Sequence, residues 1–483
     1  MKEVMPANPE LEIEESGYHS SGEATTNIAL PLAIDFLLAA GWLVFCLIGF
    51  VVMFVANQKI VGAAIIAVPT FIGMILKPSF ALSIFMLVLP SGTAIAVEGR
   101  FTLNKGIGIA MALSFLLNIM LTRPKLKMNK TVLWLVLAYY IWTIFAVIVN
   151  SGPFMLSQLF TKVQYIAFFL IVYWILETNK EKNFLWILRS FIAGTCGTVI
   201  LAFVTGAAIR AVEESADSSR FTATAGGAIN ANALAAMLAL AMLSAVYLLI
   251  KDRKIVLRII YAFSIFFLGI MLFKTGSRGT LVAIIVTFVV ISFGRQLIRN
   301  PVPVLGILFV LGIFLATGYF LLKTGKIQED VVKRLTDVYM AKQSIADRMI
   351  YNKAALNVAM ERLTGGGYGT WFTYTDVDLY PHNDLMYSIG VYGFPAGFLF
   401  LSFIIGMMLA VKRIPFGFEK MYAKAILVFL LLIGLKGMYV DEKFYWVFWV
   451  IALACEKFGG SSVEQEHIQP EQSLESFSDE EKI

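Results

Sequence analysis

The stretch TVLWLVLAYYIWTIFAVIV, residues 131–149, contains no ionisable side chain except its two tyrosines. A helix needs an apolar run of about 20 residues to cross a hydrocarbon core about 30 Å thick. Similar runs recur along most of the chain, which is 59% hydrophobic and only 15% charged. The sequence therefore predicts an all-α integral membrane protein that crosses the bilayer many times.

The apolar runs predict about 12 to 14 transmembrane helices. They begin near residues 32, 60, 79, 106, 131, 160, 186, 231, 255, 279, 302, 384, 421 and 444. Cytoplasmic loops are enriched in lysine and arginine. These residues gather in the connections 123–130, 180–182, 251–258, 295–299 and 412–424. Alternating spans place all five on one side, so both termini are expected in the cytoplasm.

The predicted organisation has five parts. Residues 1–30 form an acidic cytoplasmic tail and residues 458–483 a disordered cytoplasmic tail, because both are rich in acidic and polar side chains. Residues 31–322 form the first set of transmembrane helices, and residues 384–457 form the C-terminal set. Residues 323–383 form a large extracytoplasmic loop, which is predicted to contain the catalytic residues.

This loop is expected to contain short helices. A connection of about 60 residues is usually functional or disordered. Two amphipathic helices are predicted, near residues 328–342 and 347–362, with Asp347 capping the second. The glycine run at residues 365–367 should end that second helix.

Three connections on the outer side lead into helices that enter the membrane from outside. A helix N-terminus carries partial positive charge and unpaired N–H groups, which together attract anions. Outer connections should contain few arginines, yet these contain arginines, glycines and His382, the only histidine outside the polar tails. The candidate residues are Arg220 and Asn230 in the first, Ser277, Arg278 and Gly279 in the second, and His382 and Asn383 in the third.

These residue types suit group transfer from a phosphorylated donor. A guanidinium stays charged and binds phosphate oxygens with a planar fork of donors, and a neutral imidazole accepts a proton near pH 7. Each residue also has a simpler explanation. Arg278 could snorkel to the membrane surface, Arg220 could be solvated, Asn230 could only cap a helix, and His382 could be structural.

Five short motifs share a resemblance to one family. They are RFTATA followed by NANAL from Arg220, SRG at residues 277–279, the pair Asp347 and Arg348, GGGYG at residues 365–369, and the pair His382 and Asn383 followed by Gly390 and Gly393. In this order, from Arg220 to the last span, the chain resembles the O-antigen ligase and O-antigen polymerase family of bacterial envelope glycosyltransferases. Two departures are a missing proline in the first motif and GGGYG in place of a glycine-valine-glycine turn.

The resemblance implies a role for each candidate residue. Arg278 and Arg220 would bind the diphosphate of an undecaprenyl-linked oligosaccharide, and Arg348 would add a third cation. His382 would be the base that activates the acceptor hydroxyl, and Asn383 would orient the histidine or the acceptor. Asn230, Ser277 and Gly279 are expected to complete the substrate-binding site.

The expected function is an inverting, metal-independent membrane glycosyltransferase of the bacterial inner membrane, with no cofactor and its active site on the outer face. The donor is undecaprenyl-diphosphate-linked oligosaccharide. The acceptor is either another lipid-linked repeat unit, which is favoured and makes the protein a polysaccharide polymerase, or a lipid core, which makes it a ligase. The sequence Asp376-Val377-Asp378 is similar to a metal-binding D-x-D motif, but nucleotide sugars are absent from the outer side.

The alternative of another class is a transporter or flippase for an anionic lipid-linked or small solute. Such a protein needs charged groups near the bilayer midplane, and the nearest candidates are Asp35 and Lys436. The lipid bilayer is a partner in either case. Nucleic acid is not expected as a partner, because the basic residues are scattered over many short loops.

Overall fold

The computed structural model describes residues 41–42, 44–49, 51–52, 58–91, 103–122, 129–152, 154–178, 181–204, 230–292, 312, 316, 318–320, 323–324, 338–377 and 379–458. The chain divides into two compact units, Met1–Ile72 and Gly73–Ile483. In the first unit, the described residues between 41 and 52 are helical, and Trp42 Nε1 donates a hydrogen bond to Thr70 Oγ1 at 2.8 Å. The candidate site lies in the second unit.

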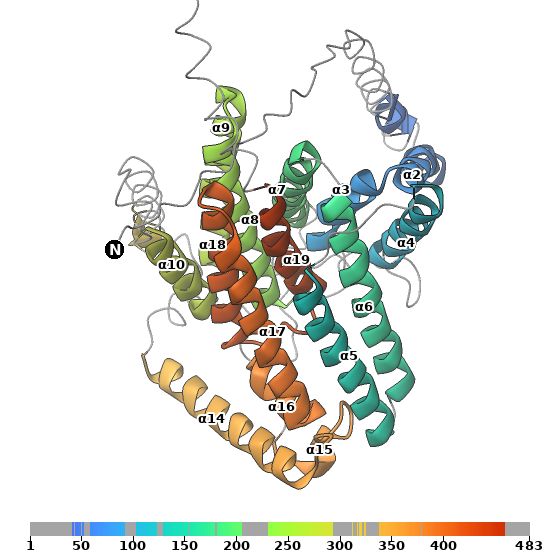
Figure 1. The fold of residues 1–483 in the computed structure, drawn as a ribbon. Coiled ribbons are helices and arrows are strands. Elements are labelled where there is room, and N and C mark those ends of the chain that lie inside the picture. The colour runs from blue at the N-terminus through green and yellow to red at the C-terminus, as the bar shows by residue number, and fades with distance from the viewer. Residues whose placement is uncertain are drawn as a thin grey trace, which may run out of the picture. The chain divides into compact units, whose positions relative to one another are not determined.

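The regular elements in the described part of the chain are all helices, coloured along the chain in Figure 1. They are α2 (Lys59–Leu76), α3 (Pro78–Val88), η1 (Leu89–Ser91), α4 (Leu103–Thr122), α5 (Lys130–Asn150), α6 (Met155–Thr178), α7 (Glu181–Val204), α8 (Ala231–Lys251), α9 (Ile255–Lys274), α10 (Arg278–Ser292), α14 (Val338–Glu361), α15 (Trp371–Tyr374), α16 (Asp384–Tyr392), α17 (Phe394–Arg413), α18 (Phe418–Gly434) and α19 (Lys443–Phe458). The predicted all-α class is confirmed.

Among these helices, 7 are long and apolar enough to cross a membrane: α4, α5, α6, α7, α8, α9 and α17. The opening stretch lies in α5, which starts after Asn129, whose side chain accepts the N–H of Val132 at 3.3 Å and so caps the helix. The total of about 12 to 14 stays a prediction, because the segments expected near residues 32 and 302 fall mostly outside the described residues.

The centre of the second unit is formed by α8 and α19. In the membrane-spanning part of α8, 89% of the residues are buried. Helix α8 packs against α7, α9 and α18. Its many alanines allow neighbouring backbones to approach closely, which favours helix packing in a membrane. Helix α19 packs against α6, α17 and α18 and is buried along nearly its whole length.

The segment expected to form a single span from about residue 384 is broken at Gly393 into α16 and α17. Gly393 has a φ of 87°, which L side chains rarely adopt. A Cβ atom at Gly393 would collide with the carbonyl oxygen of Leu363. Next to this break, the N–H of Gly366 donates to the carbonyl of Gly390 at 2.8 Å. The glycine-rich turn after α14 is therefore joined to α16 by a backbone hydrogen bond.

The prediction of two short helices in the long loop is wrong over the described residues. Residues 338–361 form one helix, α14, and Asp347 lies inside it instead of capping a second helix. The expected stop is confirmed, because α14 ends at Glu361 and Gly365 follows with a φ of 69°. Helix α14 packs against α16 and runs across the end of the helices that carry the site (Figure 1). It presents Arg348 and Tyr351 to the site described below.

We expect Gly393→Ala to destabilise the second unit. The backbone strain alone should cost about 1–3 kcal/mol, and the collision with Leu363 adds to it. The midpoint of thermal unfolding in detergent measures the effect. Gly197→Ala is the control, because Gly197 lies inside α7 with open space around it and should be unchanged or slightly more stable. Equal midpoints for the two variants would contradict this account of the break.

Candidate functional site

Several helix ends meet the connection between α18 and α19, residues 435–442, which we call the α18–α19 connection. Helices α8, α10 and α16 all contact this connection at or beside their first turns, through hydrogen bonds from Tyr439 to Asn232, from Lys436 to Ser277 and from Asn383 to Leu435. Three helix N-termini therefore gather at one end of the second unit. This arrangement agrees with the expected meeting of the three outer connections.

Ser277, directly before α10, is the centre of a small polar network. Its buried hydroxyl donates to Asn232 Oδ1 at 3.0 Å and lies 3.0 Å from the Thr280 hydroxyl. A serine hydroxyl has one proton, so Thr280 is the donor in the second contact. Lys436 Nζ donates to Ser277 Oγ at 2.7 Å and to Thr280 Oγ1 at 3.3 Å. The network thus ties α8, α10 and the α18–α19 connection together.

Gly279 makes room for the Lys436 side chain. A Cβ atom at Gly279 would collide with Cδ of Lys436 and lie 2.7 Å from its Cε. The sequence suggested that glycine lets a ligand approach the backbone at this point. The structure instead places the lysine stem there, so a direct substrate contact at Gly279 stays a prediction.

His382 lies in the turn before α16 and is exposed. Its ring meets the ring of Tyr351 edge to face, with centroids 6.4 Å apart. Although the residue as a whole is exposed, partial burial of the imidazole lowers its pKa, and the positive charges of Arg348 and Lys436 lower the pKa further. The ring is therefore neutral at pH 7, which is the form that accepts a proton.

Arg348 and Tyr351 are 3 residues apart on α14 and so share one face of the helix. Arg348 is half-buried, and this burial lowers the pKa of its guanidinium. Its electrostatic interactions with Tyr439 and with His382 place it beside the α18–α19 connection. The guanidinium remains charged at neutral pH, because the ordinary pKa of arginine lies far above 7.

Asn383 and Asp384 fix the start of α16. The Asn383 side chain accepts the N–H groups of Leu385 at 2.9 Å and Met386 at 3.1 Å, and its amide donates to the Leu435 carbonyl at 3.3 Å. Asp384 is fully buried, and its Oδ1 accepts the backbone N–H of Tyr439 at 2.6 Å. Asn383 is therefore a helix cap, and its expected role toward a substrate stays a prediction.

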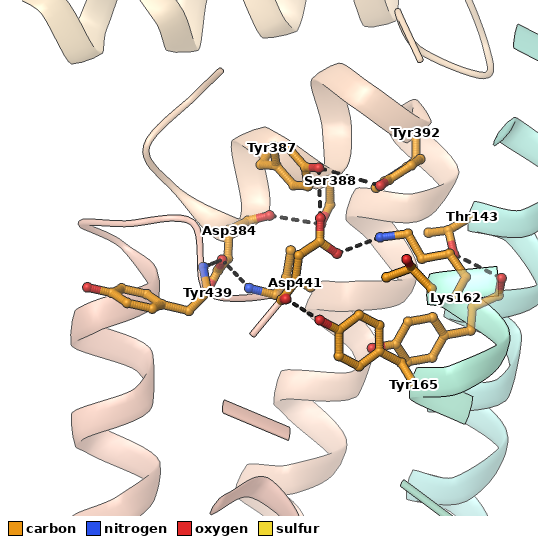
Figure 2. A network of polar contacts seen from close by, with 12 residues as sticks. Thr143, Lys162, Tyr165, Asp384, Tyr387, Ser388, Tyr392, Tyr439 and Asp441 are labelled. Atoms are coloured by element: carbon orange, nitrogen blue, oxygen red, sulfur yellow. Dashed lines mark hydrogen bonds and ion pairs between the residues drawn. The ribbon is translucent and has the colours of Figure 1, made fainter. Parts of the chain in front are cut away.

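An ion pair between a buried lysine and a partly exposed aspartate holds the other half of the α18–α19 connection (Figure 2). Lys162 of α6 is only 1% exposed, and its Nζ lies 2.5 Å from Asp441 Oδ1. The Tyr387 hydroxyl donates to Asp441 Oδ2 at 2.8 Å, and the Tyr165 hydroxyl donates to the Asp441 carbonyl. Lys162 Nζ also lies 4.8 Å from the centre of the Tyr392 ring. This network joins α6, α16 and the connection.

The remaining sequence candidates lie beside the network or outside it. Arg278 is the first residue of α10, and its Nε and Nη2 atoms are buried without a hydrogen-bond partner in the described part of the chain. Asn230 caps α8 by accepting the N–H of Asn232 at 2.9 Å and is itself exposed. Arg220 lies outside the described residues.

Sequence reasoning missed two cations of this region. Lys436 was considered only as a charge for a transporter, and Lys162 was not singled out. The signal for Lys162 was present, because a lysine within an apolar run implies a buried partner. The predicted span began near residue 160 instead of Met155, which placed this lysine at the membrane edge. No local sequence pattern predicts the contact between Lys436 and Ser277.

The described residues contain no group of 3 or more His, Cys, Asp or Glu side chains placed to hold a metal ion. Asp376 of the D-x-D motif is exposed, and residue 378 lies outside the described part of the chain.

The fold and the site define an all-α membrane protein with a cationic site at one end of its helices. Residues 263–401 match the family model described as O-antigen ligase, Wzy_C. The match confirms the resemblance to the O-antigen ligase and polymerase family over that segment, and it supports a membrane protein of the kind that transfers glycans. The segment includes Ser277, Arg348 and His382, and it excludes Lys436. No curated protein matches the chain.

We expect Lys162→Met to lower the stability of the second unit by about 1–3 kcal/mol, because the Asp441 carboxylate, which is 22% exposed, loses its charged partner. The double variant Lys162→Met, Asp441→Asn should recover part of the loss. Unfolding in detergent is the measurement, and the exposed lysine variant Lys424→Met is the control. A Lys162→Met protein as stable as the control would show that the pair does not hold the connection.

Proposed function

We propose that the protein is an inverting membrane glycosyltransferase that moves an oligosaccharide from undecaprenyl diphosphate to a sugar hydroxyl and so polymerises repeat units of a cell-surface polysaccharide. One observation carries the proposal. A neutral histidine lies beside Arg348 and Lys436, at the end of the unit where the N-termini of α10 and α16 meet the α18–α19 connection. The family match to residues 263–401 supports the transfer of a glycan.

In the proposed reaction, the cations stabilise the leaving group. When the bond between the anomeric carbon and the diphosphate breaks, its electron pair stays on the diphosphate oxygen. Arg278, Arg348 and, outside the described residues, Arg220 are the guanidinium groups assigned to that charge. Fixed donors aimed at developing charge supply a large share of catalysis in enclosed sites. In this proposal the cations take the role that a metal ion has in other transferases.

His382 is the proposed general base. Its neutral ring accepts the proton of the acceptor hydroxyl while the acceptor oxygen attacks the anomeric carbon. The products are a glycosidic bond of inverted configuration, undecaprenyl diphosphate and a protonated imidazole, which then loses its proton to water. Asn383 is assigned to orient the acceptor or the histidine, because it borders His382 and is fixed to Leu435.

The proposed location is the bacterial inner membrane, with both termini in the cytoplasm and the site on the outer face. The distribution of charge supports this orientation. The basic turn between α8 and α9, residues 252–254, and the basic pair Lys412 and Arg413 at the end of α17 lie at the helix ends opposite the site. Cytoplasmic loops are enriched in such residues.

A ligase that joins the glycan to a lipid core is the second candidate, and the description of the matching family model favours it. Purified protein in nanodiscs, supplied only with undecaprenyl-diphosphate-linked repeat units, distinguishes the two. We expect a ladder of lipid-linked polymers on a gel. Product that forms only after a lipid core is added would replace the polymerase with the ligase. Movement of the lipid without any covalent change of the glycan would favour the transporter.

We expect turnover to fall on acidification, with a midpoint below the ordinary histidine pKa of about 6.5. The lowered pKa of His382 keeps the basic form present to a lower pH. Arg348→Gln removes one of the charges that lower this pKa, so the acid limb of kcat/KM should move to higher pH. His382→Ala should reduce kcat by about 10²–10⁴-fold.

Arg413→Gln is the control for the pH profile, because Arg413 is exposed at the far end of α17. The control should keep the wild-type profile. Full turnover in His382→Ala, or an acid limb that Arg348→Gln leaves in place, would remove His382 as the base.

A further inference from the structure

Lys436 reaches from the end of one helix to the beginning of another. It follows α18, which ends at Gly434, and a lysine at this end would favourably face the negative end of its own helix dipole. The side chain instead extends to the first turn of α10, where its Nζ contacts Ser277 and Thr280. A cation at a helix N-terminus opposes the dipole and is unfavourable there.

The two side chains that accept hydrogen bonds from this ammonium, Ser277 and Thr280, are uncharged. Ser277 gives its own proton to Asn232, and Thr280 gives its proton to Ser277, so both hydroxyl oxygens are oriented to accept from Lys436. Gly279 leaves the space through which the lysine stem passes. The chain therefore sets the position of a positive charge without using a carboxylate at these two contacts.

A second cation stands at the same turn. Arg278 lies between Ser277 and Gly279, and its Nε and Nη2 atoms are buried without a hydrogen-bond partner in the described part of the chain. Buried donors nearly always have an acceptor in a native complex. The ammonium and the guanidinium carry positive charge, and both lie at the positive end of the α10 dipole. A ligand with several anionic oxygens would give the buried Arg278 donors acceptors and would face the Lys436 charge.

We infer that Lys436 is a donor-binding residue, whose ammonium, held by Ser277 and Thr280 at the first turn of α10, binds a phosphate oxygen of the diphosphate. The inference rests on the proposed function and extends it beyond the segment that matches the family model, because residue 436 lies outside 263–401. Arg278 binds the same diphosphate from the adjacent position. The ligand chemistry is a diphosphate ester, not a carboxylate or a single phosphate, because two fixed cations and a helix N-terminus share one turn.

The competing explanation is that Lys436 only fastens α18 to α10. The two explanations differ in what Lys436→Met changes. If Lys436 has only this structural role, Lys436→Met lowers stability and leaves the affinity of the folded protein for diphosphate unchanged. If Lys436 binds the diphosphate, Lys436→Met weakens diphosphate binding and raises the KM for the donor, while the KM for the acceptor stays the same.

The test measures binding of undecaprenyl diphosphate to the full-length protein in nanodiscs, with undecaprenol as the lipid without phosphate and inorganic pyrophosphate as competitor. We expect Lys436→Met to weaken the binding of undecaprenyl diphosphate about 10- to 100-fold, since a hydrogen bond to a charged group contributes roughly 1.5–3 kcal/mol. Pyrophosphate should lose affinity in parallel, and undecaprenol should bind equally to both proteins. Lys424→Met, which replaces an exposed lysine of α18, should bind as wild type.

Gly279→Ala covers the case in which Lys436→Met does not fold. The added methyl group displaces the lysine stem but leaves the charge in place, so this variant should also weaken diphosphate binding. Wild-type affinity in either folded variant would overturn the inference alone. If the wild-type protein binds undecaprenyl diphosphate no better than undecaprenol and transfers no glycan, the proposed function fails, and the inference fails with it.

Discussion

The ion pair between Lys162 and Asp441 is the contact on which the rest of the site depends. Removing a lysine from water is costly, and the charge of Asp441 together with the Tyr387 hydroxyl offsets that cost only in a well-fixed geometry. The pair joins α6 to the α18–α19 connection, and Asp384 fixes the same connection through the N–H groups of Tyr439 and Val440. These contacts hold the connection against α6 and α16, and Lys436, at the start of the same connection, contacts α10.

The distribution of charge separates a structural region from a ligand region. Around Asp441, the positive and negative groups neutralise each other and are surrounded by tyrosine rings (Figure 2). Around the start of α10, the Lys436 ammonium contacts two hydroxyls, and Arg278 keeps buried donors without an acceptor in the described residues. The first region stabilises the protein by itself. The second gains most from an anion, which is the behaviour expected of a binding site.

The sequence predicted the membrane helices well where burial in hydrocarbon alone determines them. The starts expected near residues 131, 231 and 255 agree with α5, α8 and α9 to within a residue, because an apolar run ends where charged residues begin. It failed for α14, whose mixed polar and apolar pattern does not show that Asp347 lies inside a continuous helix. Propensity is a weak guide there, since tertiary contacts with α16 decide the outcome.

The sequence indicated which helix starts lie together, and the roles of the candidate residues there stay predictions. Arginines, glycines and a lone histidine before helix starts indicated which helix ends would meet, because these residue types share one chemistry. The contacts that bring them together join residues far apart in sequence, such as Lys436 with Ser277 and Asp441 with Lys162. The match to residues 263–401 contains the proposed base and Arg348, whereas α6 and the α18–α19 connection lie outside it. In the proposed site, the histidine comes from the matching segment, and Lys436, one of the two cations that face it, comes from outside the segment.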